Sequence, residues 1–203
     1  MDKRLIFLSG LFFTLLIASN FMAIKLISIW NIILPSAVIC YPFCFVVNDL
    51  INEFYGYKTV KNVVVFAFIF NAIIVGLLTL AAIIAPSPVY ENNEAFRIIF
   101  LSAPRILFAS FTAFLVSGFL NGYVFNKIRQ KNSFLSLRSA VSTFLGIIVD
   151  SFLFITLAYA FAVPLDNLML VVLWQILAKL LIGVALGTPI TMLIVKLSNH
   201  QWR

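Results

Sequence analysis

Residues 60–85 read VKNVVVFAFIFNAIIVGLLTLAAIIA, an apolar run in which Lys61 is the only charged residue. A helix needs roughly 20 consecutive apolar residues to cross the hydrocarbon core of a bilayer, so this run predicts a transmembrane helix. The whole chain has the same character, because 63% of its 203 residues are hydrophobic and only 10% are charged. A soluble domain carries about 25% charged residues, so the composition excludes a soluble protein.

Proline, asparagine and clustered charges divide the chain into six apolar segments. They run from Leu5 to Leu26, Leu34 to Phe54, Val60 to Ala85, Pro104 to Phe125, Leu137 to Val163 and Leu168 to Leu197. We expect Pro35 and Pro104 to lie in the first turns of the second and fourth helices. Pro86 and Pro164 should follow the ends of the third and fifth helices. We therefore predict an all-α polytopic membrane protein with six transmembrane helices, forming a single domain over residues 1–203.

Three helices in each half of the chain would invert the second half relative to the first, as in many transporters. The distribution of basic residues predicts the orientation. Ten of the 14 Lys and Arg residues fall on the side of the N-terminus and three on the opposite side. This bias places both termini in the cytoplasm and the protein in the cell inner membrane. The outer connection from Pro86 to Ala103 is expected to carry a short surface helix.

Several function classes are disfavoured by what the sequence lacks. It has no glycine-rich phosphate loop, so the energy for any transport would come from a gradient or from another polypeptide. His200 is the only histidine, which leaves neither a histidine metal cluster nor a catalytic triad. Cys40 and Cys44 are interpreted as packing residues. We predict no enzyme activity, no cofactor, no metal and no nucleic-acid partner.

Polar residues within the apolar segments are the candidates for function, because an ionisable group in hydrocarbon costs several kcal/mol unless it is paired or hydrated. The candidate substrate-binding residues are Asn20, Asn48, Asp49, Glu53, Arg105, Asp150, Gln175 and Lys179. At 1.5 Å of rise per residue, Asp150 and Lys179 enter from opposite sides and both lie about 17–20 Å along their helices. An interhelical ion pair and a substrate-binding role are both open for these two residues.

Asp49, Asn52 and Glu53 are spaced three and four apart, so they share one helix face, which Asn48 flanks. Carboxylates beside amides offer many acceptors and some donors, as a polar heterocycle requires. Other interpretations remain open for single residues. Glu53 could extend to the inner membrane surface, Arg105 could anchor a helix at the interface, and Asn20 could hydrogen-bond between helices.

The stretch from Asn48 to Lys58, NDLINEFYGYK, resembles the signature of the queuosine precursor transporter family, once called a vitamin uptake family. Matches in order along the rest of the chain include Ser19-Asn20, Arg105-Ile106 and Asp150-Ser151. The resemblance implies import of a 7-deazaguanine base across the membrane, by secondary active transport. The implied partners are this small base, the lipid bilayer and, as an open possibility, a second copy of the chain.

The resemblance also suggests roles for the candidate residues. Asp49 and Asp150 would accept hydrogen bonds from a guanine-like edge or from an aminomethyl cation. Asn20, Asn48 and Gln175 would meet the remaining donors and acceptors of the base. Arg105 and Lys179 would balance the negative charge or meet the ring carbonyl. Two other functions stay open: a substrate-capture subunit that works with a separate ATPase, and a structural or assembly subunit of a membrane complex.

Overall fold

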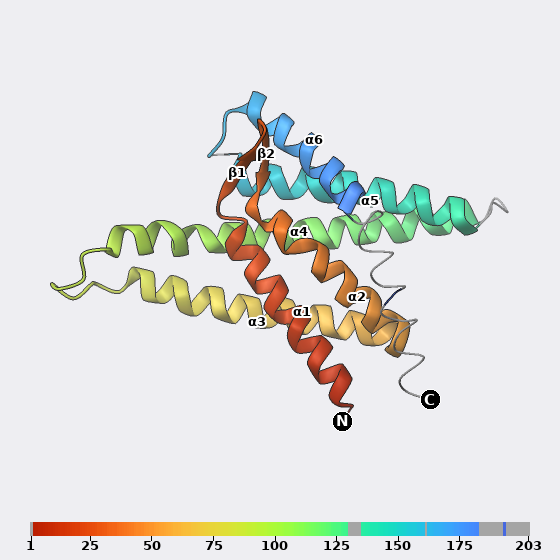
Figure 1. Ribbon diagram of the computed structural model, residues 1–203, viewed down its shortest axis with the longest axis horizontal. Helices are drawn as coiled ribbons and strands as arrows, with labels where there is room; N and C mark the ends of the chain where they lie inside the picture. Colours follow the sequence, from red (N-terminus) through yellow and green to blue (C-terminus); the bar gives the residue numbers. More distant parts are fainter. Residues whose placement is uncertain (1, 130–134, 161, 183–192, 194–203) are drawn as a thin grey trace. The chain divides into compact units, whose positions relative to one another are not determined.

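The computed structural model describes residues 2–129, 135–160, 162–182 and 193, and these residues are mostly helical (Figure 1). The helices are α1 (Lys3–Met22), α2 (Tyr41–Tyr55), α3 (Tyr57–Ile83), α4 (Asn93–Arg129), α5 (Leu135–Tyr159) and α6 (Leu165–Ile182). Helices α1, α3 and α6 and the Asn93–Leu120 part of α4 are long and apolar enough to cross a membrane. The membrane-protein class is therefore confirmed, while the count of six crossings stays a prediction.

Two predicted helix ends are confirmed, because α3 ends at Ile83, before Pro86, and α5 ends at Tyr159, before Pro164. The sixth helix begins at Leu165, three residues before the predicted Leu168. The sixth segment was predicted to reach Leu197, but of residues 183–203 the structure describes only position 193.

Pro104 lies inside α4 and does not begin a helix, so the predicted start of the fourth segment is wrong. Proline has no N–H to donate to the carbonyl four residues earlier, which here belongs to Phe100. The hydroxyl of Thr79 on α3 donates to that carbonyl at 3.3 Å. A side chain on another helix thus satisfies the carbonyl, and α4 continues through the proline. The predicted surface helix after Pro86 is likewise the first part of α4.

Pro35 does not begin the second helix either, because it ends a short strand. Strands β1 (Leu26–Ile29) and β2 (Ile32–Pro35) form a two-stranded hairpin, so the description all-α is correct only in the coarse sense. Trp30 and Asn31 form its turn with φ angles of 49° and 65°. Positive φ at both central residues gives the turn a twist that matches paired strands. A 3₁₀ helix, η1 (Ser36–Ile39), then leads to α2, where Pro42 occupies the first turn.

The described chain divides into two compact units, and the boundary falls inside α4. Of the described residues, unit 1 contains 2–27, 35–107, 181–182 and 193, and unit 2 contains 28–34, 108–129, 135–160 and 162–180. In unit 1, α2 runs back along α1, and α1 crosses α3 (Figure 1). Its core consists of apolar side chains from these three helices: Phe12, Leu16, Cys44, Val47, Ile51, Val60, Val63, Val64, Ala67 and Phe68.

The connection between α2 and α3 is a single glycine. Gly56 adopts φ 78°, a left-handed value that residues with a Cβ rarely take, and α3 starts at the next residue. Near the same end of unit 1, the phenol of Tyr55 donates to Asp2 Oδ2 at 2.6 Å. Asp2 also caps α1 by accepting from the N–H of Arg4. The start of α1 and the end of α2 are thereby joined.

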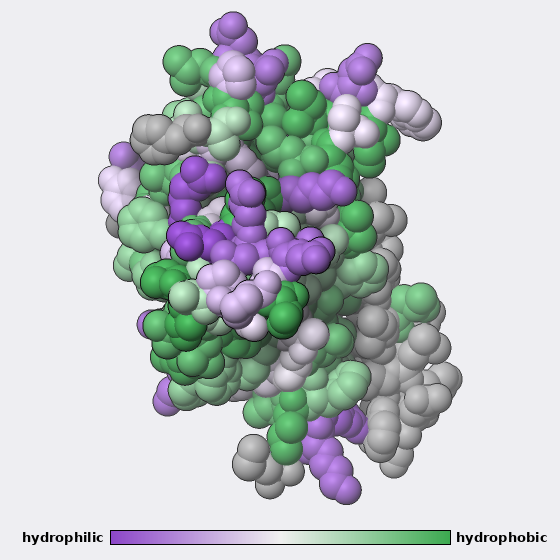
Figure 2. Space-filling model, turned by 90° about the vertical axis from the view of Figure 1, so that its left-hand side faces the viewer, coloured by the Kyte–Doolittle hydropathy of each residue, from purple (hydrophilic) through white to green (hydrophobic). Residues whose placement is uncertain are grey.

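The uncovered face of α3 is apolar. Phe66 and Leu77 are 53% and 62% exposed, whereas Ala67, on the side that packs in the core, has no exposed surface. Apolar side chains are stable in such positions when they contact lipid. Figure 2 views the end that carries the connection between α3 and α4, where hydrophilic side chains gather within a mostly hydrophobic surface. Glu91, Asn92 and Glu94 of that connection and the first turn of α4 are exposed.

Candidate functional site

Helix α2 has one apolar face and one polar face. Its apolar side chains Cys44, Val47 and Ile51 are buried against α1 and α3. The intervening positions carry Asn48, which is half-buried, and Asp49, Asn52 and Glu53, which are exposed. We call Asn48, Asp49, Asn52 and Glu53 the acidic face. The predicted sharing of one helix face by these residues is therefore confirmed.

The core of unit 1 sets the direction of the acidic face. Residues 44, 47 and 51 recur every three or four positions, and burying them turns positions 48, 49, 52 and 53 outward. Within the described parts of the chain, neither carboxylate of the acidic face forms an ion pair. Two carboxylates and two amides are thus open to a ligand or to water.

Asn20 and Arg105 also belong to unit 1. Asn20 is 7% exposed, near the end of α1, and its Nδ2 has no hydrogen-bond partner among the described residues. Arg105 is half-buried on α4, and its buried Nε also lacks a described partner. Asn20 Nδ2 therefore donates no hydrogen bond to a described residue. The role of Arg105 as an interface anchor stays a prediction.

The other three predicted residues belong to unit 2. Lys179 on α6 forms an ion pair with Asp150 on α5, and Ser117 on α4 donates to the other carboxylate oxygen at 3.5 Å. The side chains of Lys179 and Asp150 are 8% and 18% exposed. Gln175 is buried one turn before Lys179. The sequence left an interhelical ion pair and a substrate-binding role open for Asp150 and Lys179. The structure contains the ion pair.

Asn71 is a further buried polar residue that lies outside the eight predicted ones. It has no exposed surface, and neither its Nδ2 nor its Oδ1 has a hydrogen-bond partner in the described structure. The signal for it is present in the sequence, because it is an amide in the middle of the α3 apolar run, with only apolar residues for a full turn on each side. Buried amides are normally hydrogen-bonded, so Asn71 requires an explanation.

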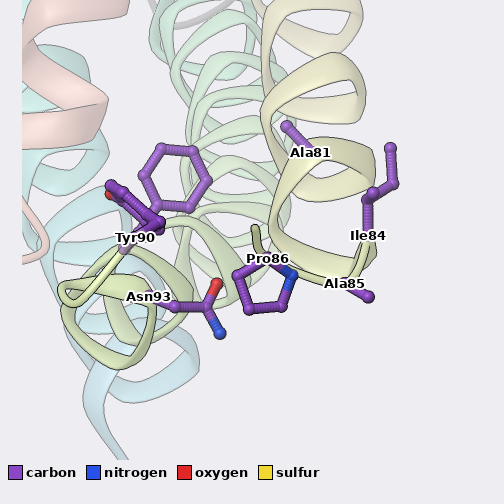
Figure 3. A pocket seen from close by; sticks show the side chains of 7 residues that line it. Ala81, Ile84, Ala85, Pro86, Tyr90 and Asn93 are labelled. Atoms are coloured by element: carbon purple, nitrogen blue, oxygen red, sulfur yellow. The ribbon is translucent and has the colours of Figure 1, made fainter. Parts of the chain in front are cut away.

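A pocket of about 370 Å³ lies where α3 ends and α4 begins (Figure 3). It is lined by Ala81, Ile84, Ala85, Pro86, Tyr90, Asn93 and Phe96. Tyr90 and Asn93 are its only polar side chains, and none of the eight predicted site residues lines it. No cluster of His, Cys, Asp and Glu suited to a metal ion occurs among the residues that the structure describes.

Long apolar helices that carry polar and charged groups define a multi-pass membrane protein of the transporter class. Residues 35–194 match the family described as "Putative vitamin uptake transporter", and the chain belongs to this family. The resemblance seen in the acidic face and in Tyr55-Gly56-Tyr57 is therefore confirmed.

Two curated relatives carry the name "Probable queuosine precursor transporter". The protein from Bacillus subtilis (strain 168) is 24% identical over 153 residues, which cover 74% of this chain and 67% of that protein. The protein from Haemophilus influenzae (strain ATCC 51907 / DSM 11121 / KW20 / Rd) is 28% identical over 119 residues, covering 59% of this chain and 49% of that protein. The chain therefore aligns with about half the length of the second relative. No solved structure matches the chain.

Proposed function

We propose that this protein imports 7-deazaguanine precursors of queuosine across the cytoplasmic membrane, with residues 1–203 acting as one transport domain and both termini in the cytoplasm. The observation that carries the proposal is the acidic face of α2, which is uncovered although the opposite side of the helix packs in the core. The names of the two curated relatives support the class of substrate.

The chemistry of the acidic face suits a guanine-like base. Such a base presents a ring N–H beside an NH₂ group, and one carboxylate can accept both hydrogen bonds in a bidentate pair. We assign this role to Asp49, with Asn48 beside it as donor and acceptor. Glu53, one turn further along, would meet the cation of an aminomethyl substituent. Each contact is charge-assisted and therefore stronger than a neutral hydrogen bond.

The family description leaves a second candidate, in which the chain captures a vitamin and depends on a separate ATPase. The experiment that separates the candidates measures uptake of labelled 7-deazaguanine precursors into cells that cannot synthesise them, with and without the chain. We expect uptake that depends on the chain, that persists when candidate ATPase partners are deleted, and that unlabelled precursor competes away.

The other outcomes are equally informative. If deletion of an ATPase abolishes uptake, the chain is a substrate-capture subunit and not a secondary transporter. If a vitamin competes for uptake and no 7-deazaguanine does, the substrate is a vitamin and not a queuosine precursor. Absence of any uptake by a chain that is present in the membrane would overturn the proposal in favour of a structural subunit.

A further inference from the structure

The pocket between the end of α3 and the start of α4 has a lining that suits a flat, uncharged molecule. Tyr90 and Asn93 lie on one side of it, and Ala81, Ala85 and Pro86 lie on the other (Figure 3). Its volume of about 370 Å³ falls within the range of small-molecule sites, which are mostly apolar with a few polar groups. The polar groups here are a phenol and an amide, and none of the seven lining residues is charged.

Aromatic rings continue from this pocket along α4. The ring centroid of Tyr90 lies 6.5 Å from that of Phe96, which lies 4.4 Å from that of Phe100. The ring of Phe100 is in turn 5.9 Å from that of Phe21, near the end of α1. We call these four rings the aromatic ladder. Its three phenylalanines are half-buried, so each leaves part of its surface uncovered. Flat rings in succession are stacking surfaces for a flat solute.

The surroundings of the pocket are hydrophilic. Tyr90 is 46% exposed, and its neighbours Glu91 and Asn92 are exposed as well. Figure 2 shows hydrophilic side chains gathered at this end of the molecule. A molecule dissolved in water can therefore reach the pocket. With both termini in the cytoplasm, as proposed above, the connection between α3 and α4 faces the outside, where import begins.

A guanine-like base matches the lining in two ways. Its bicyclic ring system can stack on the ring of Tyr90. The amide of Asn93 offers a carbonyl oxygen that accepts from the ring N–H and an NH₂ group that donates to the neighbouring ring carbonyl. The acyl chain of a lipid would fill the apolar part of the pocket and leave both polar groups unused.

We propose that this pocket is the outer capture site of the transported base, in which the base stacks on Tyr90 and pairs with Asn93. The inference rests on the proposed function and adds a second binding site to it. One edge of the base cannot contact Asn93 and Asp49 at the same time, so the two sites bind in turn. The neutral pair at Asn93 is weaker than the charge-assisted pair at Asp49, which favours release of the base from the capture site.

The test labels Ala85→Cys in intact cells with a membrane-impermeant maleimide, with and without 7-deazaguanine. Position 85 lines the pocket and is exposed. We expect labelling from the outside that the base slows. The matched control is Ser87→Cys, because Ser87 is exposed in the same connection and does not line the pocket. The base should leave its labelling unchanged. The unsubstituted protein gives the background of the buried Cys40 and Cys44.

The concentration of base that halves the labelling is independent of how much protein reaches the membrane. Adding Tyr90→Leu to Ala85→Cys should raise this concentration about tenfold, since a stacking contact is lost. Tyr90→Phe keeps the ring and should leave it within about twofold. Asn93→Leu should raise it as well, and it provides a second test if the protein with Tyr90→Leu does not reach the membrane.

Uptake of 7-deazaguanine by the same cells separates this inference from the proposed function. If the base enters the cells but does not slow labelling at position 85, the pocket is not a capture site and the proposed function stands. The same conclusion follows if the base protects position 87 equally, or if position 85 reacts only in permeabilised cells. Protection by a fatty acid and not by the base would make the pocket a lipid site. If the cells show neither uptake nor protection, the proposed function fails together with this inference.

Discussion

The two groups of charged residues in this chain are stabilised in different ways. In unit 2, Asp150 is paired with Lys179 and accepts from Ser117, so the protein itself supplies the opposite charge. In unit 1, Asp49 and Glu53 lie on an exposed helix face, and no cation among the described residues pairs with them. A paired charge can serve to fix how helices pack, whereas an unpaired carboxylate needs water, an ion or a substrate. The contrast separates a structural pair from a candidate binding surface.

The largest expected effect concerns the ion pair. Lys179→Leu leaves Asp150 as an uncompensated buried charge, and breaking such a pair costs about 3–5 kcal/mol. We expect the amount of protein in the membrane to fall strongly, as measured by quantitative immunoblotting of the membrane fraction. The double variant Asp150→Leu with Lys179→Leu should restore the amount, because neither charge remains.

The reciprocal swap, Asp150→Lys with Lys179→Asp, sharpens the same comparison. Restored abundance without restored uptake would show that the pairing is structural and that the positions also serve transport. If the swap restores both abundance and uptake, the ion pair has a structural role only. If Lys179→Leu leaves abundance unchanged, the ion pair is not what stabilises unit 2.

Asp49→Asn should have the opposite phenotype to Lys179→Leu. The substitution keeps the size of the side chain and removes its charge, and the position is exposed, so we expect normal abundance. Uptake of labelled 7-deazaguanine should fall about tenfold or more, since a bidentate charge-assisted contact is lost. Glu94→Gln, an exposed carboxylate on the first turn of α4, is the control and should transport normally.

The smallest effect is expected at the contact between Asp2 and Tyr55. The hydrogen bond from the Tyr55 phenol, with that from the Arg4 N–H, holds the pKa of Asp2 below its usual value. A lowered pKa in the folded state stabilises the protein above the unfolded value of about 3.9, and this contribution is lost as the pH falls through the folded pKa. Tyr55→Phe should therefore lower the unfolding temperature slightly at neutral pH.

The measurement is the unfolding temperature of the purified protein in detergent at neutral pH and at an acidic pH low enough to protonate Asp2 in the folded protein. The difference between Tyr55→Phe and the unsubstituted protein should disappear at the lower pH. Because phenylalanine keeps the ring, a difference that persists there would mean that the hydroxyl stabilises the fold without the ionised carboxylate of Asp2.

Local spacing predicted most of the helices and the acidic face, because the period of a helix is set by the backbone alone. The end of α3 before Pro86 follows from the missing N–H of proline in the same way. Local sequence could not show that α4 continues through Pro104, because the hydroxyl that donates to the Phe100 carbonyl belongs to Thr79, 21 positions away. The hairpin was missed since Trp30, which adopts a positive φ in its turn, is a residue type that rarely signals one.

The candidate site was predictable to different degrees. Equal depth along two helices correctly suggested that Asp150 and Lys179 could pair, since charges at one level in a bilayer attract each other. Asn71 was missed because an uncharged amide is a weaker signal than a carboxylate, although its lack of a partner becomes clear once its burial is known. The unsatisfied Nε of Arg105 also depends on tertiary packing, which residue spacing does not determine.

The central claim is that the acidic face of α2 lines a water-filled path that the substrate enters. It is tested most directly by labelling Asn52→Cys in intact membranes with a hydrophilic maleimide, with and without 7-deazaguanine. Cys40 and Cys44 are buried, and the unsubstituted protein gives their background. Leu77→Cys, on the exposed apolar face of α3, is the control. We predict rapid labelling at position 52 that the base slows, and little labelling at position 77. If position 52 is as unreactive as position 77, the acidic face does not contact water and the account is wrong.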